Sequence, residues 1–138
     1  MKDAKSKKKS KVGIVFTIGI IILAIVILLT GSINVKYNEN DFTVSASFWK
    51  SSTYKYEEIE EIKLLDSYDK GSRTVGVGSL RLNVGAFRSD DFGNYTLYSY
   101  SGSESGVYLK INGNTVVISC ENNESTKEVY EELKDRME

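Results

Sequence analysis

Proline and histidine are absent from this 138-residue chain, and cysteine occurs once, at Cys120. Without histidine there can be no Ser-His-Asp triad and no zinc site built from histidine and cysteine. One cysteine cannot form a disulfide framework within the chain. We therefore expect no metal site and no cofactor. Cys120 falls in a strand-like stretch, which favours a small buried apolar residue over a reactive thiol.

The net charge of −1 conceals a strong asymmetry along the chain. Residues 1–11 contain six lysines and one aspartate, a net charge of +5, whereas residues 36–138 contain 12 basic and 18 acidic residues, a net charge of −6. A nucleic-acid partner needs a basic face to neutralise phosphates, so the acidic part argues against one. It argues equally against tight binding to anionic lipid headgroups.

A long apolar run predicts one transmembrane helix over residues 12–33. No charged residue occurs between Val12 and Val35, and residues 12–30 contain fourteen isoleucine, leucine, valine or phenylalanine residues. A helix of about 20 such residues spans the ~30 Å hydrocarbon layer of a bilayer. The glycines of the run are not spaced as G-x-x-x-G, so no helix dimerisation face is predicted.

The lysines before this run set the expected orientation. The positive-inside rule places residues 1–11 in the cytoplasm and residues 36–138 outside, as one extracytoplasmic domain of a single-pass protein of the cell membrane. The rival is a cleaved signal peptide, for which Thr30, Gly31 and Ser32 are small enough to form a cleavage site. The apolar run exceeds the usual signal core of about 7–15 residues, which favours a retained anchor.

Alternation of apolar and polar residues predicts a half-buried strand over Asp41–Phe48, and Trp49 then breaks the alternation and starts a bend. The inward residues of this strand are expected to be Phe42, Val44, Ala46 and Phe48. Trp49 is expected to pack rather than to recognise a ligand.

The stretch that follows changes its pattern twice. Thr53–Tyr56 can form a short strand. Ile59 and Ile62 are three residues apart, as on one helical turn, and the four glutamates around them face water. Ile62–Leu65 returns to a strand.

The clearest local signal is a hairpin over residues 107–120. Asn112-Gly113 lies between two alternating runs, which is the strongest short hairpin signal and predicts a type I′ turn. A two-residue loop pairs Ile111 with Asn114, Leu109 with Val116 and Val107 with Ile118, so the apolar residues share one face. The glycines of residues 71–94 are explained by strand bends and bulges.

A further strand and a final helix complete the predicted elements. Tyr95–Tyr100 is a strand whose register stays open, because the loop that follows is flexible: Tyr98 and Tyr100 face the core or line up with Tyr108 outside. Ser125–Glu128 fits a capping box at the start of a helix. The apolar stripe of that helix consists of Val129, Tyr130, Leu133 and Met137.

Strands followed by one amphipathic helix is the order of pleckstrin-homology (PH) domains. The chain resembles the membrane-tethered bacterial PH-like domains over roughly residues 36–137. The motifs that carry the resemblance are, before the hairpin and the helix, Tyr54–Ile59, Arg73–Gly78, Gly85–Phe87 and Gly93–Tyr98. It implies a mainly β fold with one C-terminal α-helix: a partly open seven-stranded β-barrel closed by that helix and, here, preceded by one transmembrane helix.

The resemblance does not carry phosphoinositide binding with it. Relatives that bind phosphoinositides have a basic run between their first two strands, and Phe48–Tyr56 offers only Lys50 and Lys55. No phosphoinositide binding is therefore expected.

These observations favour a non-catalytic binding or adaptor module that faces outside and meets a protein or an envelope ligand. Tyrosine and arginine are enriched at interaction hot spots. The candidate contact residues are Arg73, Arg81, Arg88, Tyr98, Tyr100 and Tyr108.

Two alternatives stay open. A regulatory or immunity-type partner of another membrane protein would act through the helix in the bilayer, and the lack of polar residues in the span counts against this. A carboxylate-dependent envelope hydrolase would need two carboxylates about 5–10 Å apart across a cleft. The only loop acids that suit this role are Asp66, Asp69, Asp90 and Asp91, all of which fit turns better.

Overall fold

The computed structural model describes residues 2–138, with side chains from Lys11 onward. The lysine side chains of residues 2–9 lie outside this described part. The chain begins with one long helix, α1 (Lys2–Leu29). It divides into two compact units, and the boundary lies between Thr30 and Gly31. By length and composition the segment Lys11–Leu29 can cross a membrane, a property that a retained anchor shares with a signal sequence.

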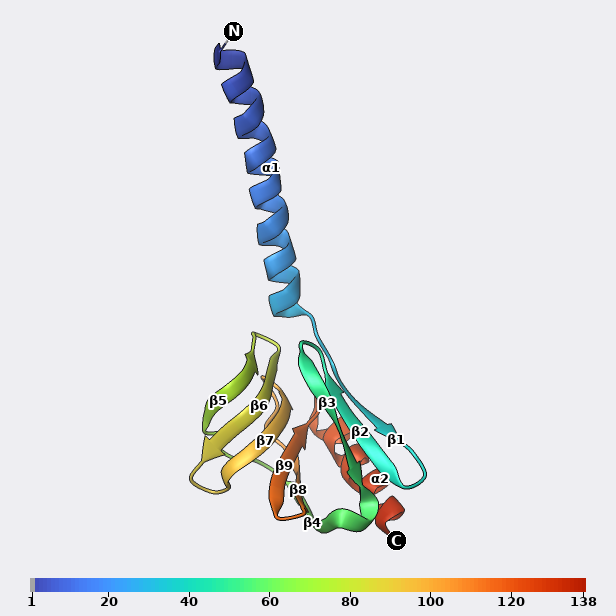
Figure 1. The fold of residues 1–138 in the computed structure, drawn as a ribbon. Coiled ribbons are helices and arrows are strands. Elements are labelled where there is room, and N and C mark those ends of the chain that lie inside the picture. The colour runs from blue at the N-terminus through green and yellow to red at the C-terminus, as the bar shows by residue number, and fades with distance from the viewer. Residues whose placement is uncertain (1) are drawn as a thin grey trace. The chain divides into compact units, whose positions relative to one another are not determined.

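The second unit is mainly β and ends in a helix, α2 (Asn123–Met137) (Figure 1). One sheet has the strand order β1-β2-β3 and the other the order β4-β8-β9-β7-β6-β5; both sheets are open. A 3₁₀ turn, η1 (Tyr56–Glu58), joins them. The strands are β1 (Ile33–Tyr37), β2 (Asp41–Ala46), β3 (Trp49–Lys55), β4 (Ile59–Leu65), β5 (Ser72–Gly78), β6 (Leu82–Ser89), β7 (Gly93–Tyr100), β8 (Gly106–Ile111) and β9 (Asn114–Ser119).

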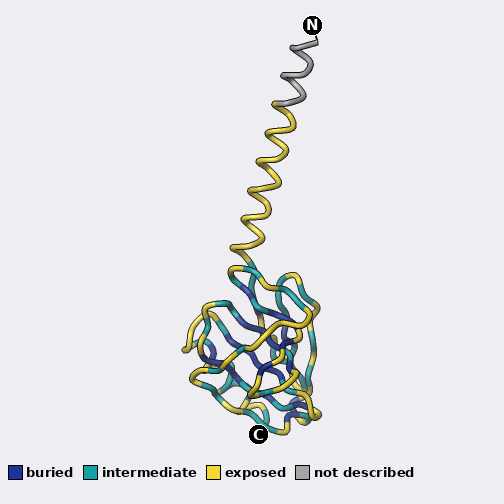
Figure 2. The backbone as a smooth tube through the Cα atoms, turned by 90° about the vertical axis from the view of Figure 1, so that its left-hand side faces the viewer, coloured by how far each residue is buried: buried dark blue, intermediate teal, exposed yellow. Residues whose placement is uncertain are grey.

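The predicted class, mainly β with one C-terminal helix and a preceding apolar helix, is confirmed. Within residues 2–138 the strands number nine rather than the seven that the resemblance implied. Figure 2 shows the buried stretches inside the second unit, whereas residues 11–29 of α1 are exposed throughout.

The six-stranded sheet is packed on both faces. Its inner face joins the three-stranded sheet and α2 in the main core, where Phe42, Leu109 and Leu133 have no exposed surface. Burying a side chain of this size contributes about 1.5–3 kcal/mol. A second cluster covers the opposite face and consists of Phe87, Tyr95, Leu97 and Val117 with Tyr68, Phe92 and Tyr108 against them.

The predicted hairpin is confirmed residue by residue. Ile111 pairs with Asn114, Leu109 with Val116 and Val107 with Ile118. Asn112 and Gly113 have φ values of 50° and 79°, as a type I′ turn requires. The open register of β7 is also settled, because β7 pairs in parallel with β9. Tyr98 and Tyr100 consequently face the main core, and Tyr108 faces the second cluster.

The helical turn predicted from Ile59 and Ile62 is wrong in its position. Both residues belong to β4, and the helical turn η1 precedes them. A bulge between Ile59 and Glu61 sets two residues of β4 against one of β8. The extra residue puts Ile59 and Ile62 on the same face, so a bulged strand imitates the three-residue spacing of a helix.

The inward position predicted for Phe48 is wrong as well. β2 ends at Ala46, which pairs with Trp49, so Ser47 and Phe48 form a two-residue turn. Phe48 is 55 % exposed and has a φ of 68°. Trp49 does pack against the main core, as expected.

The start of α2 was placed too late. The cap is Asn122, whose side-chain oxygen accepts a hydrogen bond from the Ser125 backbone N–H at 2.7 Å, so Ser125 lies inside the first turn. The predicted apolar stripe is confirmed, because Leu133 is buried and Val129, Tyr130 and Met137 pack against the main core.

Candidate functional site

β1 is an edge strand, and its outer backbone groups form one side of the candidate site. Residues of an antiparallel pair alternate between those that bond to the neighbour and those that face away. Ser32 and Asn38 bond to β2, so Ile33, Val35 and Tyr37 turn their N–H and C=O groups toward the free edge. The Ile33 N–H confirms this direction, since it donates to the Tyr100 hydroxyl at 2.9 Å. Val35 and Tyr37 therefore present unpaired backbone groups along this edge.

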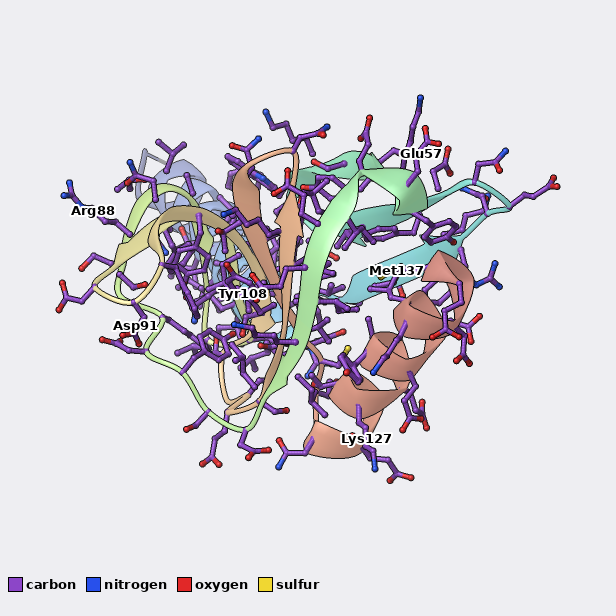
Figure 3. The ribbon with its side chains drawn as sticks, turned by 90° about the horizontal axis from the view of Figure 1, so that it is seen from below. Glu57, Arg88, Asp91, Tyr108, Lys127 and Met137 are labelled. Atoms are coloured by element: carbon purple, nitrogen blue, oxygen red, sulfur yellow. The ribbon has the colours of Figure 1, made fainter. Side chains whose placement is uncertain are left out.

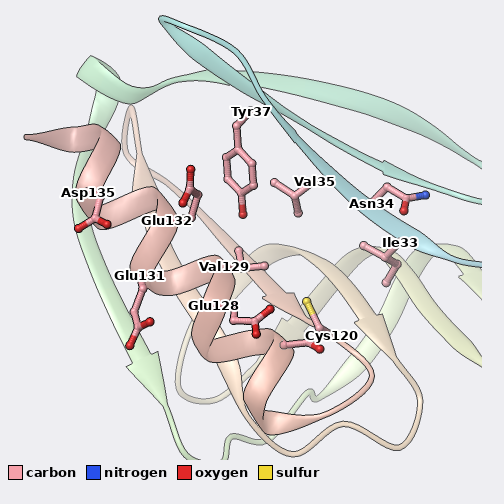
Figure 4. Close-up of a pocket in the computed structure, with 11 residues that line it drawn as sticks. Ile33, Asn34, Val35, Tyr37, Cys120, Glu128, Val129, Glu131, Glu132 and Asp135 are labelled. Carbon is pink, nitrogen blue, oxygen red and sulfur yellow. The ribbon is translucent and has the colours of Figure 1, made fainter.

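Helix α2 forms the other side, and the two elements enclose a groove of about 610 Å³. Figure 4 shows Val35 and Tyr37 pointing from β1 toward α2, with Glu132 reaching toward the Tyr37 ring. The side chains that line the groove from β1 are Ile33, Asn34, Val35 and Tyr37, and those from α2 and the segment before it are Cys120, Ser125, Glu128, Val129, Glu131, Glu132 and Asp135. The floor is apolar and the helical wall is acidic.

Local sequence explains why both walls form. Ile33-Asn-Val-Lys-Tyr37 alternates apolar and polar residues, and the following Asn38 side chain donates to the Asp41 carboxylate at 2.7 Å across the β1–β2 turn. On α2 the apolar stripe faces the main core, which turns the adjacent carboxylates toward β1. The groove is thus a product of the fold and needs no ligand to form it.

Arg136 is not among the lining residues, but it connects α2 with the end of β1 beside Tyr37. Its Nε donates to the Glu132 carboxylate at 2.7 Å, its Nη1 donates to the Asn38 carbonyl at 3.2 Å, and its guanidinium lies 5.1 Å from the centre of the Tyr37 ring. At the near end the Cys120 backbone N–H donates to the Thr126 hydroxyl at 3.0 Å. Burial raises the pKa of the Cys120 thiol, so this thiol is protonated at neutral pH and is a poor nucleophile.

The electrostatics of the groove favour a cation. Its lining residues carry four carboxylates, on Glu128, Glu131, Glu132 and Asp135. Arg136 pairs with Glu132 and Lys127 with Glu131, so among the described residues Glu128 and Asp135 are the two without an ion pair. Burial, and after it the Glu132 carboxylate, raise the pKa of Tyr37 to about 12. The carboxylates of Glu128 and Asp135, rather than the buried phenol, would favour a lysine or arginine side chain in the groove.

Chemically, this arrangement suits an extended peptide. A chain laid along β1 would bond to the backbone of Val35 and Tyr37, and every second side chain would point toward α2. Basic side chains at those positions would meet the carboxylates of α2.

The residues predicted from sequence do not gather at this groove. Arg81 and Tyr100 do meet each other: the guanidinium lies 5.1 Å from the ring centre, and Arg81 also pairs with Glu121 and donates to the Gly31 carbonyl at 2.8 Å. Together with the bond between Tyr100 and Ile33, these contacts fasten the first strand to β6 and β7.

The other four predicted residues are dispersed. Tyr98 is 1 % exposed and its hydroxyl donates to Ser52 at 3.0 Å, which links the two sheets. Tyr108 lies among the aromatic rings of the second cluster, and Arg88 points outward (Figure 3). Arg73 is exposed on β5, on the neighbouring strand.

The acids considered for catalysis lie in turns. Asp66 and Asp69 are exposed between β4 and β5, where Asp69 accepts a hydrogen bond from the Gly71 N–H at 3.0 Å. Asp90 and Asp91 are exposed between β6 and β7. Among residues 11–138 no group of three or more cysteine, aspartate or glutamate side chains is placed to hold a metal ion.

Sequence reasoning missed β1, although Ile33–Tyr37 has the alternation of a strand. Its apolar residues follow directly on the apolar run of α1, which hid the pattern. The acids of α2 were also visible, at spacings of three and four residues, but such a stripe is equally typical of a solvated face.

In a comparison with protein families, the family described as bacterial PH domain matches residues 33–135. Comparison with curated proteins and with solved structures found no match. The matched region begins at β1 and ends within α2, so it includes both walls of the groove.

Proposed function

The chain belongs to the bacterial PH domain family, and on this premise we propose that its outer domain binds an extended, positively charged segment of a partner protein in the groove between β1 and α2. PH domains are generally non-catalytic binding modules. The observation that carries the proposal is the free backbone edge of Val35 and Tyr37 opposite four carboxylates. Backbone pairing supplies affinity, and the carboxylates select basic side chains.

Location forms the second part of the proposal. α1 remains as a single anchor, with residues 1–11 in the cytoplasm and the PH domain outside the cell membrane. The one-sided lysines and the length of the apolar run support this. Anchoring confines the domain to the membrane surface and raises its effective concentration toward neighbouring membrane proteins.

Binding can be tested with synthetic peptides and the full chain in nanodiscs of zwitterionic lipid. The probes are three short peptides that alternate valine with lysine, with serine or with glutamate. We expect affinity to fall in that order, since only the lysine peptide complements the acidic wall. A fourth peptide with a central proline lacks one backbone donor and should bind more weakly than its parent. Equal affinity for the lysine and glutamate peptides would contradict the proposal.

Charge reversal on the helix supplies the matched control. The double variant Glu128→Lys, Asp135→Lys should lose affinity for the lysine peptide by at least about tenfold, which corresponds to about 1.4 kcal/mol. Glu104→Lys changes an exposed acid in the β7–β8 loop by the same charge and should bind as the parent does. If both variants lose affinity equally, the attraction comes from net charge and not from the groove.

In cells, a photo-crosslinking residue at Val35 should capture a partner through an extended segment that contains lysine or arginine. The same residue at Thr74, exposed on β5, is the control. Capture only from Thr74 would shift the contact to the surface near Arg73 and Arg88, which stay predicted contact residues. Replacing α1 by an unrelated apolar helix tests the alternative of a partner recognised in the bilayer, since capture at Val35 should then persist.

A further inference from the structure

Two turns of the PH domain hold the residues that directly follow α1. The β2–β3 turn contributes Ser47, whose backbone N–H donates to the Ser32 carbonyl at 3.0 Å and whose hydroxyl accepts from the Ser32 N–H at 3.0 Å. The β5–β6 turn contributes Arg81, whose Nε donates to the Gly31 carbonyl at 2.8 Å. A Cβ atom on Gly31 would lie 2.9 Å from the Leu82 side chain and 3.5 Å from Ser47. Gly31 is therefore enclosed between the two turns.

Chain connectivity limits how far Gly31, and the turns that contact it, can lie from the end of the apolar segment. The apolar segment ends at Leu29, and only Thr30 separates it from Gly31. Two Cα steps span at most about 7.6 Å. The headgroup region on one side of a bilayer is about 5–8 Å thick. If α1 spans a bilayer, the two turns cannot lie farther away than its interface.

Both turns carry an exposed apolar side chain at the tip. Phe48 is 55 % exposed and Leu80 is 71 % exposed, and Val75 is the one other large apolar residue of the PH domain, residues 31–138, that is comparably exposed. Single exposed apolar residues are ordinary. Here two of the three occur on the two turns that touch Gly31 and Ser32, which is not a scattered distribution.

The backbone at Phe48 gives an independent reason to look for a role of the side chain. A φ of 68° is the left-handed region, where glycine or asparagine is expected and a bulky residue is an outlier. The β8–β9 turn follows that rule with Asn112 and Gly113. A phenylalanine in this position is unfavourable for the turn, and its ring is exposed, which are two reasons to seek a role for the side chain outside the domain.

Charge at this end of the domain is compatible with a membrane surface. The segments 30–33, 46–50 and 78–82 contain no acid, although the domain as a whole is acidic. Their basic residues are Lys50 and Arg81, the latter paired with Glu121. Trp49, beside Phe48, is half-buried and of the residue type enriched at membrane interfaces.

We propose that Phe48 and Leu80 insert into the headgroup layer of the bilayer that holds α1, and so dock the PH domain on the membrane in one orientation. The inference rests on the proposed anchoring of α1. It does not depend on the groove, which lies between other elements. The partner of this surface is lipid, recognised through apolar contact and not through a specific headgroup.

Trp49 is the single tryptophan of the chain and reports on this contact without a label. The full chain is placed in bilayers of zwitterionic lipid with bromine at shallow acyl positions, which quenches tryptophan only at short range. We expect strong quenching in the parent and severalfold weaker quenching in the double variant Phe48→Ser, Leu80→Ser. Val75→Ser, in the middle of β5, is the matched control and should leave quenching unchanged.

Phe48→Gly separates membrane contact from folding. Glycine suits the left-handed backbone, so this variant should unfold at higher denaturant concentration and yet show weaker quenching. A loss of stability would show that Phe48 is a packing residue and would overturn the inference.

Flotation of the same samples with the vesicles distinguishes the two proposals. Vesicle-bound chain with equal quenching in parent and double variant would overturn the docking and leave the anchor intact. Chain that does not float with the vesicles would overturn both.

Discussion

Gly76 and Gly85 face each other across β5 and β6 with no room for a side chain on either. A Cβ atom on Gly85 would lie 2.2 Å from the Val75 carbonyl oxygen and 2.6 Å from the Gly76 Cα, and the φ of Gly85 is +135°. The obstructing atoms are backbone and cannot rotate away. The two glycines therefore allow the backbones of the paired strands β5 and β6 to approach each other closely at this point.

Gly85→Ala should lower the free energy of unfolding by about 2–4 kcal/mol, because it combines a clash with an unfavourable φ. Gly102→Ala is the control: nothing lies within 4 Å of its Cβ position, and the change should stay within about 0.5 kcal/mol. Chemical denaturation followed by Trp49 fluorescence measures both. If Gly85→Ala lowered the free energy of unfolding by no more than Gly102→Ala does, the close approach of β5 and β6 would not require glycine.

Hydrogen exchange should alternate along β1. The Asn34 and Lys36 amides bond to β2 and should be protected, whereas those of Val35 and Tyr37 should exchange at least about tenfold faster. Binding of the lysine peptide should slow the fast pair only. The Ile33 amide is protected through Tyr100, so Tyr100→Phe should make it exchange quickly. Uniform rates along β1 would contradict the free edge.

The cap of α2 can be located by substitution. Asn122→Ala should cost about 1 kcal/mol, since it removes the acceptor for the Ser125 N–H. Ser125→Ala should cost little, because the Ser125 side chain does not cap the helix. Thermal or denaturant unfolding measures both variants. A larger loss of stability for Ser125→Ala than for Asn122→Ala would show that Ser125 caps the helix, as the sequence predicted.

Alkaline pH should destabilise the domain partly through Tyr37. The pKa of this phenol is about 12 in the folded domain, against 10.0 ordinarily, so the folded state retains its proton where the unfolded state has lost it. The contribution of Tyr37 to the free energy of unfolding is thus fully present below pH 10 and is lost between about pH 10 and 12. Tyr37→Phe should flatten the decline in unfolding free energy over this range. Part of the decline should remain, since burial also raises the pKa of Tyr54 to about 12.

Local signals predicted the elements in which turn chemistry and apolar pattern agree. In the β8–β9 hairpin, Asn112-Gly113 fixes the same register that buries Leu109 and Val116, and the register was correct. At Phe48 the two signals conflict, because the pattern suggests a longer strand and the pairing of Ala46 with Trp49 ends it. At Ile59 and Ile62 a bulge changes the period of the strand. Such irregularities have no signature in apolar spacing alone.

The candidate site was beyond reach of the sequence for a different reason. Its walls, β1 and α2, lie at opposite ends of the domain sequence, and no local pattern indicates that they come together in space. The predicted arginines and tyrosines were chosen by residue type, which does not distinguish Tyr98, buried between the sheets, from an exposed contact. The role of Arg73 and Arg88 as contact residues for a partner stays a prediction.

The position of β9 between β7 and β8 has a consequence for how the domain is made. Within residues 2–138, β4 is connected with the meander of β5, β6 and β7 solely through the hairpin of residues 106–119. During synthesis, the hairpin leaves the ribosome after β4, β5, β6 and β7, the strands that it connects. Until then the nascent chain has the β1–β3 sheet, the strand β4 without its partner, and the β5–β7 meander. A chain interrupted before Gly106 would lack the pairing that unites these parts, and its open strand edges would favour aggregation or degradation over a smaller stable domain.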